Sequence, residues 1–116
     1  MSSIYYHDYD DTTAYFGMWK EYLERYLACT NIFELHIWNE ETKLIDFALK
    51  YGIIKEDPWT SGKIITGKVT DQFIEMLLST AGYIYDGVFH KMTPFFNIFL
   101  DDIFESSHWG TEIHYI

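Results

Sequence analysis

The sequence predicts a single α+β domain in which about four helices pack on a small mixed or antiparallel sheet of five to six short strands. Segments with apolar residues at helical spacing are interspersed with segments in which apolar and polar residues alternate, and no regular βαβ repeat appears. An Asp-Gly pair lies between two β-rich triplets at 83–90, which is typical of a hairpin. The 116 residues are 48% hydrophobic and contain no linker or repeat. One domain over residues 1–116 is therefore expected to bury a core of its own.

The first half of the chain predicts two strands, each followed by a helix. Residues 3–6 favour a short strand, and the helix after it begins at Asp11 or Thr12, where acidic side chains suit the positive end of the helix dipole. Residues 31–38 alternate Phe, Leu and Ile with Glu and His, which is the pattern of a half-buried strand. The second helix is expected within 39–52, because Asn at its start and Gly at its end are common helix boundaries.

The second half of the chain predicts further strands and helices around the hairpin. The expected elements are a strand at 63–69, a helix at 70–82, the hairpin at 83–90, a helix at 94–106 and a strand at 109–116. The helix at 94–106 opens on proline, which is favoured at the first helical position, and it is rich in Phe, Leu and Ile.

The chain is strongly acidic, with 18 acidic and 8 basic residues and a formal net charge of −10. Such a surface repels phosphates, which argues against direct binding of nucleic acid. It also argues against anionic membrane surfaces. A negative surface attracts basic proteins and accelerates their encounter. The charge therefore predicts a basic protein as the partner.

Neither a disulfide nor a targeting segment is indicated. Cys29 is the one cysteine; it falls near the end of the first helix and is expected to be a buried thiol. A chain without disulfides fits a reducing compartment. The N-terminal residues are acidic and lack the features of a signal peptide, and no apolar run approaches the roughly 20 residues of a membrane span. We therefore expect a cytoplasmic protein.

Motifs for catalysis or cofactor binding are missing from the sequence. It contains no Cys-x-x-Cys, His-Glu-x-x-His or Gly-x-Ser-x-Gly, and the segment 62–67 lacks the Lys-Ser/Thr of a phosphate-binding loop. We therefore expect no cofactor and no enzymatic activity.

A Glu-x-His pair occurs twice, as Glu34 with His36 and as Glu112 with His114. Both pairs lie on predicted strands, where a spacing of two places both side chains on one face. If the two strands were neighbours, the four side chains would converge into a site for zinc or another divalent metal. The alternative is that they are ordinary residues on the solvent-facing side of a sheet. We favour this alternative and predict no metal site.

Aromatic residues are abundant, with ten Tyr, nine Phe and four Trp. Tyr and Trp dominate many protein–protein hot spots, although the same rings also fill cores. Trp59 lies in a predicted loop and the two hairpin tyrosines share one face, while three acidic residues lie on the exposed edge of the helix at 94–106. The residues expected to contact a partner are Trp59, Tyr83, Tyr85, Asp86, Asp101, Asp102 and Glu105.

Charge and aromatic content together favour an acidic inhibitor that binds and neutralises a basic partner. Nucleases and other phosphate-handling proteins have positive clefts, which such a surface complements. Within this class we favour an immunity protein against a bacterial nuclease toxin. A phage anti-defence inhibitor or DNA mimic is an alternative, and a small metal-dependent enzyme using the Glu/His residues is another. The very apolar helix at 94–106 also suggests a homodimer.

Overall fold

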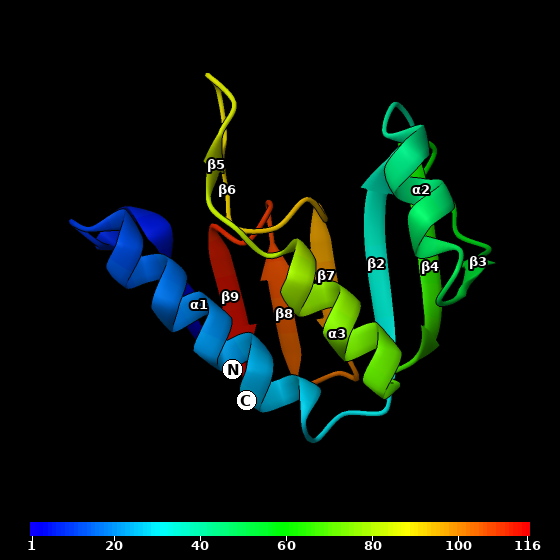
Figure 1. Ribbon diagram of the computed structural model, residues 1–116, viewed down its shortest axis with the longest axis horizontal. Helices are drawn as coiled ribbons and strands as arrows, with labels where there is room; N and C mark the ends of the chain where they lie inside the picture. The colour runs from blue at the N-terminus through cyan, green and yellow to red at the C-terminus, as the bar shows by residue number, and fades with distance from the viewer.

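A seven-stranded antiparallel sheet forms the body of the molecule, and three helices lie against one of its faces (Figure 1). The computed structural model describes all 116 residues and confirms the α+β class. The strands are β1 (Ser2–Tyr5), β2 (Ile32–Trp38), β3 (Ile53–Lys55), β4 (Gly62–Lys68), β5 (Ile84–Tyr85), β6 (His90–Lys91), β7 (Asn97–Leu100), β8 (Phe104–Ser107) and β9 (Glu112–Tyr115). The helices are α1 (Thr12–Leu27), α2 (Thr42–Ala48) and α3 (Asp71–Thr80), with a short 3-10 turn at Tyr6–Asp8. None of the helices has both the length and the apolar character needed to cross a lipid bilayer.

The strand order in the large sheet is β1-β9-β8-β7-β2-β4-β3. Every neighbouring pair is antiparallel, and β5 and β6 form a separate two-stranded hairpin. The first and last strands of the chain pair with each other near one edge, with Ile4 opposite Ile113. The longest ladder joins β2 to β4, from Ile32 opposite Lys68 to Trp38 opposite Gly62.

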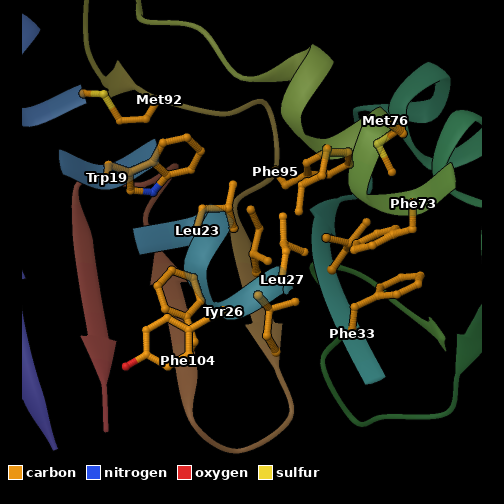
Figure 2. Close-up of a cluster of buried hydrophobic side chains, with 14 of the residues drawn as sticks. Trp19, Leu23, Tyr26, Leu27, Phe33, Phe73, Met76, Met92, Phe95 and Phe104 are labelled. Carbon is orange, nitrogen blue, oxygen red and sulfur yellow. The ribbon is translucent and has the colours of Figure 1, made fainter. Parts of the chain in front are cut away.

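The core lies between the sheet and the helices. On β2, Phe33, Leu35 and Ile37 are fully buried, as the alternation in the sequence predicts. The ring of Phe33 stacks on that of Phe73 from α3, with the centroids 3.8 Å apart. Trp19 of α1 is fully buried, and its indole N–H donates to a hydroxyl of β8 at 3.0 Å (Figure 2). The helices therefore seal one face of the sheet and leave the other without a covering layer.

The predicted starts of α1 and α3 are confirmed by their caps. The Asp11 carboxylate accepts from the backbone N–H of Thr13 at 2.9 Å, and the Thr70 hydroxyl accepts from that of Phe73 at 3.1 Å. The second helix is shorter than the predicted 39–52, because Asn39 donates its side-chain N–H to the Thr60 carbonyl instead of capping a helix. The edge strand β3 follows this helix, and the sequence predicted no strand there.

The helix predicted at 94–106 is wrong, because this segment forms β7, a turn and β8. Ile98, Leu100 and Phe104 are buried in the core, whereas Phe99 between them points to the opposite face. β7 pairs with the distant strand β2, and β8 pairs with β9, the next strand along the chain. This pairing satisfies the backbone and overrides a local helical pattern. The suggestion of a homodimer rested on this helix, and the segment does not form one.

Cys29 is exposed, so the prediction of a buried thiol is wrong. It lies beyond the last residue of α1, where Tyr26 and Leu27 occupy the buried positions of the final turn. The hairpin predicted at 83–90 is confirmed, with Tyr85 opposite His90. It stands beyond one end of the sheet (Figure 1, yellow).

Candidate functional site

The face of the sheet opposite the helices is the largest surface that no element covers. We call it the open face and define it by the side chains that alternate with the buried ones on the central strands. These are Glu34, His36, Trp38, Asn97, Phe99, Glu105, Ser107, Glu112 and His114. Because side chains on neighbouring strands stand side by side, most of them are half-buried rather than fully exposed. The open face is thus an ordered surface that mixes carboxylates, imidazoles and aromatic rings.

The two Glu-x-His pairs lie on this same face, but they do not meet. Glu34 and His36 are on β2, Glu112 and His114 are on β9, and β7 and β8 separate these strands. Three strand spacings of roughly 4.8 Å place the pairs about 14 Å apart. No group of three or more His, Cys, Asp or Glu side chains is arranged to hold a metal ion. The condition under which the pairs would form a metal site is therefore not met.

On the β9 side, Glu112 connects two histidines. Its two carboxylate oxygens lie 3.2 Å from His108 Nδ1 and 3.3 Å from His114 Nε2. The other ring nitrogen of His114 lies 2.7 Å from the Ser3 hydroxyl on the edge strand β1. In a catalytic triad, serine is the nucleophile, histidine is the base and a carboxylate orients the histidine, so these three residue types match such a triad. Ser3 is exposed on an edge strand, however, and so lacks the enclosed, water-excluding surroundings of a catalytic centre.

On the β2 side, the Glu34 carboxylate lies between a lysine and a histidine. Its carboxylate lies 2.5 Å from Lys55 Nζ and 3.6 Å from His36 Nε2. Burial lowers the pKa of His36 below the ordinary histidine value, and the Glu34 carboxylate opposes part of this shift. His36 is accordingly neutral at pH 7, so the charge of this region is set by its carboxylates and by the Lys55 ammonium that pairs with Glu34.

Three hollows lie along the open face, and neighbouring hollows share a lining residue. We call them lower, middle and upper, in order from the β7–β8 turn toward the hairpin. The lower hollow, about 410 Å³, is lined by Ile32, Glu34, Phe99, Asp101 and Asp102. The middle hollow, about 320 Å³, is lined by Glu34, His36, Asp57, Trp59, Ile64, Phe96 and Asn97. The upper hollow, about 440 Å³, is lined by Trp38, Val88, Phe89, His90, Phe96, His108, Trp109 and Thr111. Glu34 links the first two and Phe96 the last two, so they form one furrow that passes from acidic to aromatic surroundings.

The aromatic part of the furrow is held together by ring contacts. Trp38 packs on Trp59 and on Phe96, with centroids 5.4 Å and 4.8 Å apart. Trp109 packs on Phe96 and on Phe89 of the hairpin, both at 4.8 Å. Trp59, predicted in a loop, is therefore part of this surface and is half-buried in it.

The turn between β8 and β9 positions Trp109 by an unusual backbone conformation. His108, Trp109 and Gly110 all have positive φ, at 52°, 57° and 90°. Positive φ is uncommon for residues other than glycine and costs free energy at each of them. The Trp109 carbonyl accepts from the backbone of Met92 at 2.7 Å, which holds the turn in place. Strain of this kind gathers at functional sites, which supports a role for this end of the furrow.

Asp101 has a structural role in the lower hollow. It lies in the turn between β7 and β8 with φ at 48°, and its carboxylate accepts from the backbone N–H of Asn31 at 3.2 Å and of Ile32 at 2.9 Å. These bonds tie the turn to the start of β2. Asp102, the next residue, is exposed and makes no such bond. Glu105 projects from β8 onto the open face and accepts from the Ser107 hydroxyl.

Replacing Asp101 by Ala is expected to lower the free energy of unfolding by about 2 kcal/mol, because two backbone donors lose their acceptor and alanine is strained at positive φ. Asp102→Ala is the matched control, with an expected change within about 0.5 kcal/mol. Urea unfolding monitored by tryptophan fluorescence measures both. Equal losses in the two variants would contradict a structural role specific to Asp101.

The hairpin residues predicted to bind a partner lie at the other end of the furrow from Asp101 and Asp102. Figure 1 shows the hairpin beyond one end of the sheet and the β7–β8 turn at the opposite end. Tyr83 and Tyr85 both stack on His90, and each remains exposed by more than a third. Backbone N–H groups of Phe89 and Val88 lower the pKa of Asp86 to about 2, so this carboxylate is ionised and shapes the turn. Asp101 and Asp102 line the lower hollow and Trp59 lines the middle one, whereas Tyr83, Tyr85 and Asp86 line none of the three. The predicted contact residues therefore do not form a single patch.

Several residues of the furrow escaped the sequence prediction. Phe96, Phe99 and Trp109 were assigned to a helical core or to a terminal strand without a role. Phe99 lies between the buried residues Ile98 and Leu100 on a strand, so its side chain points to the opposite face. This alternation is the sequence feature that could have placed it on the open face. Comparison of the chain with protein-family models, with curated proteins and with solved structures found no match.

Proposed function

We propose that this protein is an inhibitor that binds one basic protein through the furrow of its open face and thereby neutralises it. The observation that supports this most is the joining of the acidic lower hollow to the aromatic upper hollow on a face that no helix covers. Carboxylates steer and orient a basic partner, while the rings supply contact area at low entropic cost. The lower hollow contains three carboxylates and no base among its lining residues.

The size of the open face suits a protein partner. Seven strands at a spacing of about 4.8 Å make a sheet roughly 29 Å wide. The hairpin and the Trp59 loop at its border enlarge this face, and a standard interface takes about 800 Å² of each partner. Val88 of the hairpin, which is 72% exposed, lines the upper hollow and extends the apolar part of that surface.

Within this class, a nuclease toxin is the partner we favour, and the protein is then its immunity protein. A nuclease presents basic groups that normally contact phosphates, and an acidic furrow complements them in charge. An anti-defence inhibitor would use the same furrow on a different basic enzyme, so the identity of the partner distinguishes the two.

Co-expression tests the proposal directly. A basic domain encoded next to this chain should arrest growth when expressed alone, and growth should recover when this protein is expressed with it. The two proteins should co-elute as a stable complex that weakens at high salt. Growth arrest that persists despite equal expression of both chains would refute the immunity function.

A further inference from the structure

A further hollow of about 420 Å³ lies between the start of α2, the end of α3 and the root of the β5–β6 hairpin. It shares no residue with the three hollows of the furrow. Its lining residues are Glu41, Thr80, Gly82, Ile84, Asp86, Lys91, Thr93 and Pro94. Three carboxylate or ammonium groups therefore meet in one cavity, and the rest of its wall is small or apolar.

Most polar groups of this cavity already have partners. Asp86 accepts from two backbone N–H groups of its own turn and lies 3.2 Å from Lys91 Nζ. The Lys91 ammonium also lies over the ring of Trp109, 4.5 Å from its centroid. The Thr80 hydroxyl donates to the Leu77 carbonyl at 3.0 Å. These groups are satisfied without a ligand.

Glu41 is the exception. Its Oε2 atom is buried and has no hydrogen-bond partner. Burial raises the pKa of Glu41 above the ordinary glutamate value, and the positive charge of Lys91 opposes this only in part. A carboxylate that is partly withdrawn from water and has no donor costs free energy, which a cationic donor that reaches the carboxylate from the cavity would recover. The C-terminal end of α3, at Thr80, adds the negative end of a helix dipole to the same cavity.

We propose that this cavity binds an alkylammonium group through the Glu41 carboxylate. The group is supplied either by a lysine side chain of the protein partner or by a free amine. In the first case the cavity is an anchor for the partner, and that case rests on the function proposed above. Binding of a free amine does not depend on that function.

Titration with n-butylammonium chloride tests the cavity without any macromolecular partner. In two-dimensional amide NMR spectra, the signals of Glu41, Thr80 and Gly82 are expected to shift saturably, with a Kd on the order of 1–10 mM. The neutral isostere n-butanol is expected to cause no saturable shift. Shifts confined to the lower hollow around Glu34 and Asp102 would overturn the proposal, because that site is also acidic.

Glu41→Gln removes the charge and keeps the shape of the side chain, and it is expected to weaken amine binding at least tenfold. Glu40→Gln removes the same charge from the exposed neighbouring residue and is expected to change the Kd less than twofold. Equal affinities in the two variants would overturn the proposal. The Glu41→Gln variant is expected to fold, since a neutral amide relieves a buried charge.

The same two variants identify the source of the ammonium group. If the amine binds and Glu41→Gln also weakens the complex with the basic partner, the source is a lysine of that partner. If the amine binds and the complex is unaffected, the cavity serves a free amine. If no complex with a basic partner is found, the amine titration still shows whether the cavity binds an alkylammonium group. The failure of one proposal is therefore distinguishable from the failure of the other.

Thermal stability offers an independent readout of Glu41. A carboxyl group whose pKa is raised in the folded state binds more protons when the protein is folded. Its contribution to the free energy of unfolding therefore falls as the pH rises above 4.5, the ordinary pKa of the group in the unfolded chain. The melting temperature of Glu41→Gln is therefore expected to exceed that of Glu40→Gln increasingly as the pH is raised from 4.5 to 7. A Glu41→Gln variant that melts below Glu40→Gln at pH 7 would show that the carboxylate has a stabilising partner in the fold, which contradicts a free ligand-binding group.

Discussion

Replacing Glu34 by Gln together with Asp102 by Lys is expected to slow association with the basic partner at least about tenfold at low salt. The double variant removes three units of negative charge from the lower hollow. In the proposed complex, the long-range field of these charges guides the partner to the furrow. The effect is expected to shrink strongly at high salt, because screening removes the same field in the parent protein. Stopped-flow or surface-plasmon measurements of the association rate at two salt concentrations give the result.

The control changes the same net charge on the covered side of the molecule. Glu24→Gln together with Glu75→Lys alters exposed residues of α1 and α3 and also removes three units of negative charge. Its association rate is expected to stay within about twofold of the parent, since the altered charges lie behind the sheet. If both double variants slow association equally, the net charge alone steers the partner and the open face has no special part.

The second large effect is expected at Gly110, where substitution by Ala should lower the free energy of unfolding by about 3 kcal/mol or more. Gly110 has φ at 90°, a conformation that side chains rarely adopt. An added Cβ would lie 2.8 Å from Met92 Cβ and 2.8 Å from Trp19 Nε1, inside the packed core. The Gly110 carbonyl also accepts from the buried hydroxyl of Tyr15, so a shift of the backbone would break that bond.

Gly87 provides the matched control for this prediction. It also has positive φ, at 96°, but it lies at the tip of the hairpin with no atom within 4 Å of an added Cβ. Gly87→Ala is therefore expected to cost only the backbone strain, about 1 kcal/mol. Chemical unfolding of both variants separates strain from packing, and an equal loss in the two would mean that the core around Trp19 accommodates the extra methyl group.

The Gly110 variant also connects stability to the proposed site. Gly110 follows Trp109, whose ring forms part of the wall of the upper hollow and packs on Phe89 of the hairpin. Any movement of this turn displaces that wall. We therefore expect the variant to bind the partner more weakly even at temperatures where it remains folded.

Local signals in the sequence were sufficient to predict the helices that begin with a capping residue and the strand in which apolar and polar residues alternate. Asp11 and Thr70 start helices as predicted, because a side chain that accepts a backbone N–H two or three residues ahead acts within one turn. The alternation on β2 likewise predicted which side chains are buried. The Asp-Gly pair at residues 86–87 predicted the hairpin, since its turn conformation depends on those residues alone.

The segment 94–106 shows where local pattern is ambiguous. Its apolar residues fit a helical stripe, and they also fit two short strands that alternate around a turn at Asp101. The choice between the two depends on whether β2, which lies far away in the chain, and β9, the next strand along it, offer free edges. Propensity is worth only fractions of a kcal/mol per residue, so pairing with distant strands decides.

Composition, charge and local periodicity by themselves predicted an acidic α+β domain, and the basic partner that they favour stays a proposal. Which carboxylates and rings share a surface was decided only by the tertiary structure, because strand order is a property of long-range pairing. That order separates the two Glu-x-His pairs by two strands and brings Glu34, Phe96 and Trp109 into one furrow. The tertiary structure also leaves the Oε2 atom of Glu41 buried without a hydrogen-bond partner, which no spacing in the sequence reveals.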